Sequence, residues 1–258
     1  MGELYALVSA GGSPGVTTAA LALALTWPAS AIVAECDPSG GDILAGLLSG
    51  HVPARRGLVE HAIEAGRSGG AAAVSLGAQL IPLDDERTRM VLPGLTDPRQ
   101  AAGLTSAWPA VVSALETQSA DIIADCGRLD AGPGHPLAVL SAAQTVAIVL
   151  RPTLRQVWSA RPRVDMIRDL LGGSSWLTLL LTGPGTHSAR EVADALSVPV
   201  AAVLPADSRT ASLLSDGSGG QRHLGSGPLM RSARAAGQAL RDHARTMSGQ
   251  PADAGVVR

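Results

Sequence analysis

The sequence contains no lysine and no phenylalanine, and it has one tyrosine and two cysteines. All twenty of its Lys and Arg residues are therefore arginine, so no lysine from elsewhere in the chain can replace one that a motif lacks. Aromatic residues make up 2% of the chain, which excludes an extended aromatic platform for stacking single-stranded nucleic acid. The net charge of −2 supplies no general attraction to nucleic acid or to anionic lipid.

The cysteine and hydropathy patterns exclude further classes of protein. Cys36 and Cys126 each lie in an apolar segment next to an acid, a pattern typical of small buried side chains and not of a disulfide framework. The six histidines are scattered, so we predict no Cys/His metal site. No apolar run approaches the roughly 20 residues that span a bilayer, and we predict a cytoplasmic protein without an integral membrane segment.

Apolar runs of strand length alternate with helical segments along the chain. The pattern predicts strands at residues 4–10, 31–36, 79–83, 90–92, 121–126, 145–150, 176–181 and 198–204. It predicts helices at residues 17–27, 57–67, 98–118, 154–171, 188–196 and 229–247. This alternation indicates an α/β protein with a doubly wound, mainly parallel sheet and helices on both faces. We expect one domain over residues 1–247, loose residues at 215–227 and a disordered tail at 248–258.

The loops that follow the predicted strands carry the residues that could bind a ligand or take part in a reaction. They lie at Gly11, Asp37, Asp125, Gly183 and Pro205. The carboxyl ends of parallel strands meet at one edge of a sheet, and ligands of such sheets bind there. The sequence therefore predicts a ligand site at this edge, and Asp125, which ends one of these strands, should lie beside it.

The first of these loops has the spacing of a phosphate-binding loop. Residues 10–18 read A-G-G-S-P-G-V-T-T, against the P-loop pattern G-x-x-x-x-G-K-[ST]. Ala10 replaces the first glycine, Val16 replaces the lysine, and Pro14 removes one potential N–H donor. A tight strand-to-helix turn without a ligand is the alternative interpretation of the glycines, and turns or helix caps are the alternative for Asp37 and Asp125.

This loop resembles the deviant Walker A motif, K-G-G-x-G-K-T-T, of ParA/MinD-type P-loop ATPases. Gly11 and Val16 stand where that motif has its two lysines. The run E-C-D-P-S-G at residues 35–40 is similar to the acidic D-x-D-P-x-G segment of the family. Residues 121–126 resemble its Walker B strand, and residues 204–207 resemble its late proline turn near the adenine. Order and spacing match over nearly the whole chain, and the irregular loop is closest in kind to the pilus-associated TadZ/CpaE branch.

The resemblance implies ATP or ADP and Mg²⁺ as ligands, and it implies roles for particular residues. Asp37 would orient the attacking water, Thr17 would bind Mg²⁺, and Asp125 would hold Mg²⁺ through water. The residues implied to bind nucleotide are Gly12, Ser13, Gly15, Val16, Thr17, Thr18 and Pro205. Relatives form an ATP-bridged dimer, so a homodimer and a protein partner are implied as well.

The absence of the two lysines should weaken nucleotide binding less than it slows hydrolysis. Loss of one charge-assisted contact to phosphate costs roughly 1.5–3 kcal/mol in binding, and loss of a preorganised charge in the transition state costs about 10²–10³ in rate. We therefore predict a pseudo-ATPase scaffold of the positioning or partitioning type that binds nucleotide weakly or not at all. The first alternative is a slow ATPase switch whose missing charge comes from an arginine or from a partner.

A second alternative is a nonspecific DNA-binding protein that uses clustered arginines. One cluster lies at residues 151–168 and another at residues 231–245, although most such residues form solvated faces. The segment 229–247 also occupies the place of the membrane-targeting helix of MinD-like proteins. Its apolar residues are mostly alanine, so we expect it to pack on the domain.

Overall fold

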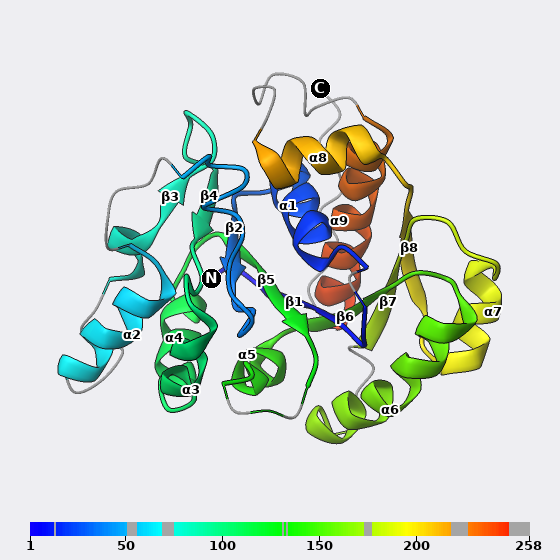
Figure 1. The fold of residues 1–258 in the computed structure, drawn as a ribbon, viewed down its shortest axis with the longest axis horizontal. Coiled ribbons are helices and arrows are strands. Elements are labelled where there is room, and N and C mark those ends of the chain that lie inside the picture. The colour runs from blue at the N-terminus through cyan, green and yellow to red at the C-terminus, as the bar shows by residue number, and fades with distance from the viewer. Residues whose placement is uncertain are drawn as a thin grey trace.

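In a computed structural model of the protein, one eight-stranded sheet runs through the molecule with helices on both faces (Figure 1). The structure describes residues 1–12, 14–50, 56–68, 75–130, 132, 134–172, 177–217 and 227–247. The strand order is β3-β4-β2-β5-β1-β6-β7-β8. All neighbouring pairs are parallel except β3 with β4. The predicted α/β class with a mainly parallel sheet is confirmed.

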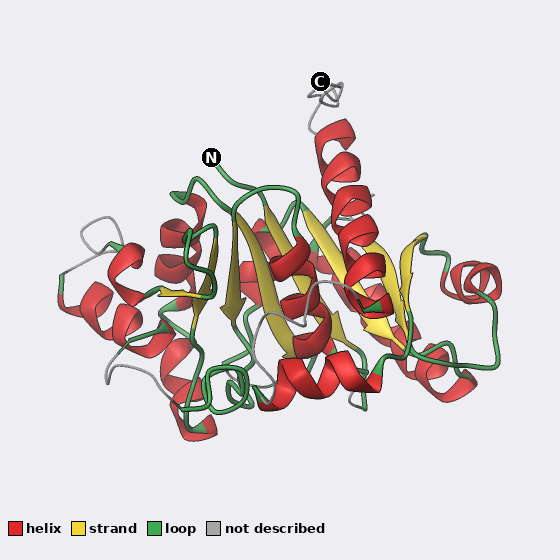
Figure 2. Cartoon of the chain, turned by 90° about the horizontal axis from the view of Figure 1, so that it is seen from above, coloured by secondary structure: helices red, strands yellow, loops and turns green. Residues whose placement is uncertain are grey.

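The strands have the following bounds: β1 Leu4–Ser9, β2 Ala31–Glu35, β3 Ile81–Pro82, β4 Arg89–Leu92, β5 Asp121–Arg128, β6 Thr145–Leu150, β7 Leu177–Thr182 and β8 Val200–Leu204. Helices α1 (Val16–Thr26), α8 (Ser208–Asp216) and α9 (Pro228–Met247) cover one face (Figures 1 and 2). The other face carries α2 (Leu58–Arg67), α4 (Trp108–Glu116), α5 (Leu137–Ala142), α6 (Leu154–Leu170) and α7 (Ala189–Leu196).

The central strand β1 shows why the sheet is buried on both faces. Leu4, Ala6 and Val8 belong to the core cluster under α2 and α4 to α7, whereas Tyr5 and Leu7 belong to the cluster under α1 and α9. Successive side chains of a strand point to opposite faces, so a continuous apolar run suits a strand that is covered twice. Strand β1 lies between β5 and β6, and its loop therefore opens at the point where the strand order reverses.

Helix α1 is apolar all round and is buried accordingly. Its alanines and leucines pack between the sheet and α9, and eight of its eleven residues are buried. Helix α9 contributes Leu229, Met230, Leu240 and three alanines to the same cluster. The apolar face of α9 thus packs on the domain as predicted, and none of the described helices is long and apolar enough to cross a membrane.

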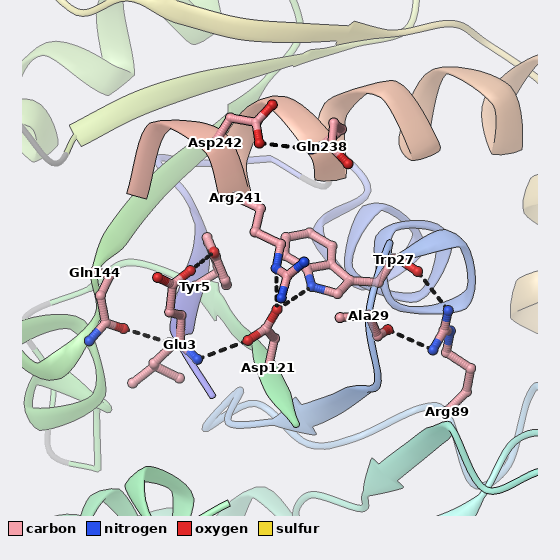
Figure 3. A network of polar contacts seen from close by, with 11 residues as sticks. Glu3, Tyr5, Trp27, Ala29, Arg89, Asp121, Gln144, Gln238, Arg241 and Asp242 are labelled. Carbon is pink, nitrogen blue, oxygen red and sulfur yellow. Dashed lines mark hydrogen bonds and ion pairs between the residues drawn. The ribbon is translucent and has the colours of Figure 1, made fainter. Parts of the chain in front are cut away.

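A polar network fixes α9 at the amino ends of the strands (Figure 3). Asp121, the first residue of β5, is 5% exposed. Its carboxylate accepts hydrogen bonds from the backbone N–H of Glu3 at 3.0 Å and from Trp27 Nε1 at 2.8 Å. Arg241 Nε of α9 lies 3.0 Å from Asp121 Oδ2. The ring of Tyr5 packs edge-on against Trp27, with centroids 4.8 Å apart. One carboxylate therefore joins β1, α1, β5 and α9.

Several boundaries differ from the sequence prediction. The helix predicted at residues 98–118 is instead a 3₁₀ turn (Pro98–Gln100), the short α3 (Ala101–Leu104) and α4. Pro109 lies in the first turn of α4, where its missing N–H is tolerated, and it could not have continued a helix from α3. The strand predicted at residues 79–83 is reduced to β3, because Gln79 ends a 3₁₀ turn that begins at Leu76.

Helices α5 and α8 were not predicted, and Ser215 and Asp216 belong to α8 where a loose segment was expected. Most of the remainder of that segment and the predicted tail at 248–258 lie outside the described residues, so the predicted domain bounds stay a prediction. Cys36 and Cys126 are buried and form no disulfide, in agreement with the prediction.

Candidate functional site

Glycines shape the loop between β1 and α1. Gly12 has a φ of 59° and Gly15, the residue before α1, has a φ of 92°. Side chains rarely adopt such angles, so the turn into α1 depends on glycine at these positions. Among the described residues no side chain caps α1, and no acid lies in its first turn. The first N–H groups of α1 therefore remain available to an anion. Ser13, predicted to bind nucleotide, lies outside the described residues.

Thr17 and Asp125 are in direct contact, although they are 108 residues apart in sequence. Thr17 Oγ1 donates a hydrogen bond to Asp125 Oδ2 at 2.5 Å. The N–H of Gly127 donates to Asp125 Oδ1 at 3.0 Å. Burial raises the pKa of Asp125 to about 6; the carboxylates of Asp37 and Asp42 add to this rise, and the hydrogen bonds from Thr17 and Gly127 oppose it. The two predicted Mg²⁺ residues thus lie together at the ends of β5 and of the loop.

Asp37 reaches the end of β5 through a gap that only glycine provides. A Cβ atom on Gly127, which has a φ of 61°, would lie 2.1 Å from Cγ of Asp37. Asp37 Oδ1 also accepts a hydrogen bond from the N–H of Ser39 at 2.7 Å, which holds the loop after β2 in a tight turn. The acids predicted after two different strands therefore converge on one place.

These residues line a cleft with a volume of about 920 Å³. Its walls come from the loop after β1, the start of α1, the segment 37–46, the end of β5 and the end of α8. The carboxylates of Asp37, Asp42 and Asp216 line it, whereas buried Asp125 is not among its described lining residues. Arg128 is the one arginine among them. Gly12, Gly15, Val16, Thr17 and Thr18, all predicted to bind nucleotide, contribute to the lining.

Neither a protein-family model nor a curated protein sequence matches the chain. Solved structures do match it. A ParA family ATPase from Chlorobium tepidum TLS matches with a TM-score of 0.72 and 16% identity, covering 93% of this chain and 98% of the ATPase. The chain has the MinD/ParA fold.

Two further structures with the MinD/ParA fold agree with this assignment. The septum site-determining protein MinD of Pyrococcus horikoshii OT3, complexed with Mg-ADP, matches with a TM-score of 0.65 and 16% identity over 95% of this chain and 98% of that one. The MinC:MinD cell division protein complex of Aquifex aeolicus matches with a TM-score of 0.63 and 15% identity, covering 99% of each chain. A particular relation to the TadZ/CpaE branch stays a prediction.

Val16 stands at the lysine position of the P-loop pattern, and its environment is apolar. The residue is 7% exposed and belongs to the core cluster formed with α1 and α9. The second lysine position, Gly11, has no side chain, and a Cβ there would lie 3.6 Å from Ser159 Oγ of α6. Neither position of this MinD/ParA fold places a positive charge at the loop.

A second, smaller pocket of about 230 Å³ lies beside the phosphate loop. It shares Pro14, Gly15 and Thr18 with the larger cleft, and its lining includes Pro205, a residue predicted to bind nucleotide. Arg151, at the end of β6, is the arginine among its described lining residues. Leu204, Ala206 and Leu229 complete an apolar wall. Its place after β7 and β8 suits the base of a nucleotide whose phosphates occupy the loop.

Glu35 is a site residue to which sequence reasoning gave no role. It is 2% exposed, and its two oxygens accept backbone hydrogen bonds, Oε1 from Ile43 at 2.9 Å and Oε2 from Gly94 at 3.0 Å. Burial raises its pKa to about 7, and the two hydrogen bonds oppose that shift. Glu35 therefore fixes the segment that carries Asp37 and Asp42.

The sequence analysis also gave no role to three residues that line the cleft, Asp42, Arg128 and Asp216. Arg128 directly follows the Walker B-like strand, a signal that sequence reasoning could have used. Asp216 could not be placed because α8 was not predicted.

The two arginine clusters serve the fold in part. Arg161 and Arg168 donate hydrogen bonds to the last carbonyls of α7. Arg163 lies 3.7 Å from Asp130, and Arg241 belongs to the network around Asp121. These guanidinium groups are therefore committed to contacts within the chain, which weakens the DNA-binding interpretation of the clusters.

Proposed function

We propose that the protein is a degenerate member of the positioning and partitioning ATPase class, a pseudo-ATPase scaffold that acts through protein partners. The observation that carries this proposal is the burial of apolar Val16 at the position of the phosphate-binding lysine. A valine side chain can neither neutralise β- and γ-phosphate oxygens nor stabilise the charge that develops on them during transfer.

The negative charge of the cleft opposes nucleotide binding, so any binding should be weak. A nucleoside triphosphate brings several negative charges to a cleft lined by three carboxylates and one arginine. Arg128 lies 3.5 Å from Asp130, so part of its charge is already compensated. Backbone N–H groups at the start of α1 offset only part of this repulsion.

The Mg²⁺ part of the site fits better than the phosphate part. Magnesium in nucleotide sites takes one or two protein oxygens and completes its octahedron with phosphates and water. Thr17 Oγ1 would supply one such oxygen and Asp125 would hold the ion through water, and when bound the ion would screen phosphate charge. The described residues contain no cluster of three or more acidic, histidine or cysteine side chains able to hold a metal, so the ion would depend on the nucleotide.

Restoring the lysine tests the proposal. Titration calorimetry with Mg-ATP should show weak or no binding to the unmodified protein, and Val16→Lys should raise the affinity about 10–100-fold, the value of one charge-assisted phosphate contact. Val16→Leu is the matched control, because it enlarges the side chain without charge and should leave affinity unchanged. Magnesium-dependent ATP turnover by the unmodified protein that Asp37→Ala abolishes would overturn the proposal.

A slow ATPase switch is the second candidate, and the position of Arg128 in the cleft favours it. In that case Arg128 would supply the charge that Val16 lacks. ATP hydrolysis by the unmodified protein, measured by phosphate release, should then fall at least about 10-fold in Arg128→Ala. Equal rates in both proteins would remove this candidate.

A further inference from the structure

Helix α6 exposes two large apolar side chains one turn apart. Trp158 is 73% exposed and Leu154 is 68% exposed. By contrast, Trp27 and Trp108 are each 2% exposed, and their indole N–H groups are hydrogen-bonded within the protein. An exposed indole beside an exposed leucine is the kind of surface that proteins reserve for partners.

The core does not need these two side chains. Helix α6 is anchored from its other side by Gln156, Ala160, Val164 and Ile167, all of them buried. Because residues spaced by three and four share a helix face, this inward row places Leu154 and Trp158 on the opposite, outward face. The exposed pair is therefore a property of the surface.

Two arginines lie close to the pair in sequence, and one of them, Arg151, also lines the smaller pocket. Arg151 and Arg155 are exposed, and between residues 151 and 164 the chain has no acidic residue. Within the described part of the chain, the guanidinium groups of Arg151 and Arg155 make no ion pair or hydrogen bond. The first acid on the helix, Asp165, follows Trp158 by two turns and faces Arg168 at 3.8 Å.

We propose that Leu154, Trp158, Arg151 and Arg155 form a docking face, here named the α6 face, for an amphipathic acidic segment of a partner protein. The apolar pair would receive the apolar side chains of that segment, and the two arginines would pair with its carboxylates. Tryptophan and arginine are the residues on which binding energy at interfaces most often concentrates.

Duplex DNA fits this face less well than an acidic peptide does. Binding to DNA depends on several cations that neutralise phosphates, whereas the α6 face offers two uncommitted arginines around an apolar centre. Arg161, on the same side of the helix, already donates to the carbonyl of Ala195. A leucine and a tryptophan at the centre suit an apolar anchor.

Helix α6 presents the α6 face on one side and borders the phosphate loop with other side chains. A Cβ atom on Gly12 would lie 3.6 Å from Gln156 Nε2, and one on Gly11 would lie 3.6 Å from Ser159 Oγ. A docked segment would therefore contact the helix that borders the candidate site. The proposal goes beyond the proposed function, and it stands whether or not the loop binds nucleotide.

A displayed library of random 16-residue peptides tests the proposal. We expect selection on the unmodified protein, with counter-selection on Trp158→Ala, to enrich peptides that combine carboxylates with apolar residues at helical spacing. A selection that enriches nothing, or that enriches peptides without acidic residues, would overturn the proposal. Both proteins should show the same circular dichroism and melting temperature, because Trp158 makes no contribution to the core.

Affinities of a synthetic enriched peptide then separate the contributions. Trp158→Ala should weaken binding about 30-fold and Arg155→Glu about tenfold, whereas Ile63→Ala, a half-exposed apolar residue on α2, should change it less than about twofold. Equal affinity for Trp158→Ala and the unmodified protein would overturn the proposal. Binding of a 30-base-pair DNA duplex that depends on Trp158 and Arg155 would overturn it in favour of nucleic acid.

Discussion

Strand β5 has one buried aspartate at its start and another near its carboxyl end, and the two have opposite surroundings. Asp121 at its start is met by an arginine, an indole N–H and a backbone N–H, and this network joins three other elements to β5 (Figure 3). Asp125 near its end is met by the Thr17 hydroxyl and the N–H of Gly127, without a cation. Burial without a cation raises the pKa of Asp125 to about 6.

The difference separates two edges of the sheet: the structural edge at the amino ends of the strands, and the edge at their carboxyl ends, here named the functional edge because the candidate site lies there. At the amino edge, charge is balanced inside the chain, so the carboxylate can stabilise the fold. At the carboxyl edge, Asp125, Asp37 and Asp42 lie close enough to repel one another, and the fold bears this cost. Uncompensated charge in a cleft is typical of a site that an external cation or ligand completes.

The largest effect is expected at the structural edge. Asp121→Ala leaves Arg241 without its ion-pair partner and Trp27 Nε1 without its acceptor in a buried setting, and it should lower the free energy of unfolding by about 3 kcal/mol. Urea denaturation at neutral pH measures this. Asp130→Ala, which removes a half-exposed ion-pair partner, should cost less than about 1 kcal/mol. Equal losses in both variants would contradict the comparison.

At the functional edge, removal of the aspartate charge is expected to raise the free energy of unfolding instead of lowering it. Because the fold raises the pKa of Asp125 from 3.8 to about 6, ionisation costs stability as the pH rises through that range. Asp125→Asn removes this cost, so the free energy of unfolding should rise by about 1–3 kcal/mol at pH 8 and should not rise at pH 4. Urea denaturation at the two pH values measures the difference.

Glu35→Gln is the matched comparison for Asp125→Asn. The pKa of Glu35 is also raised, to about 7, but each of its oxygens accepts a backbone N–H. An amide would turn its NH₂ group toward one of these donors, so this variant should gain nothing at pH 8. A gain equal to that of Asp125→Asn would show that burial alone, without regard to partners, sets the cost.

The smallest effect concerns how closely α9 approaches the structural edge. A Cβ atom on Gly237 would lie 2.9 Å from Cε3 of Trp27. Gly237→Ala should therefore push α9 outward and lower the melting temperature, at a cost of about 1–2 kcal/mol. Gly103→Ala in α3, where a Cβ meets nothing within 4 Å, should be neutral or stabilising by up to about 1 kcal/mol. A melting temperature unchanged by Gly237→Ala would contradict the close packing.

Strong periodicity made most of the fold predictable from sequence. The run at residues 145–150 is apolar from Val146 onward and was predicted with the bounds that β6 has. The failures were local. Residues 98–118 look helical on average, but Pro109 requires a new helix start, and α8 begins at an Asp207 cap that was read as part of a turn.

The candidate site was predictable wherever a residue sits at a fixed place in a motif. Thr17, Asp37 and Asp125 come from three separate segments, and the structure brings them to one edge as the parallel-sheet argument predicted. The exposed pair on α6 was not predicted, because helical spacing alone does not say which side of α6 faces the core. The network around Asp121 was not predicted either, since it joins residues up to 120 positions apart whose sequence carries no common signal.

The buried helix α1 has a consequence for the shape of the loop between β1 and α1. The loop is joined at one end to the buried strand β1 and at the other end to α1, a buried helix rich in alanine and leucine. The shape of the loop therefore depends on the packing of these two elements and on the backbone angles of its glycines. Replacing a charged side chain on the loop by an uncharged one changes neither. The loop can therefore keep its shape when the side chains along it change, and the retained shape keeps the surrounding surfaces in place.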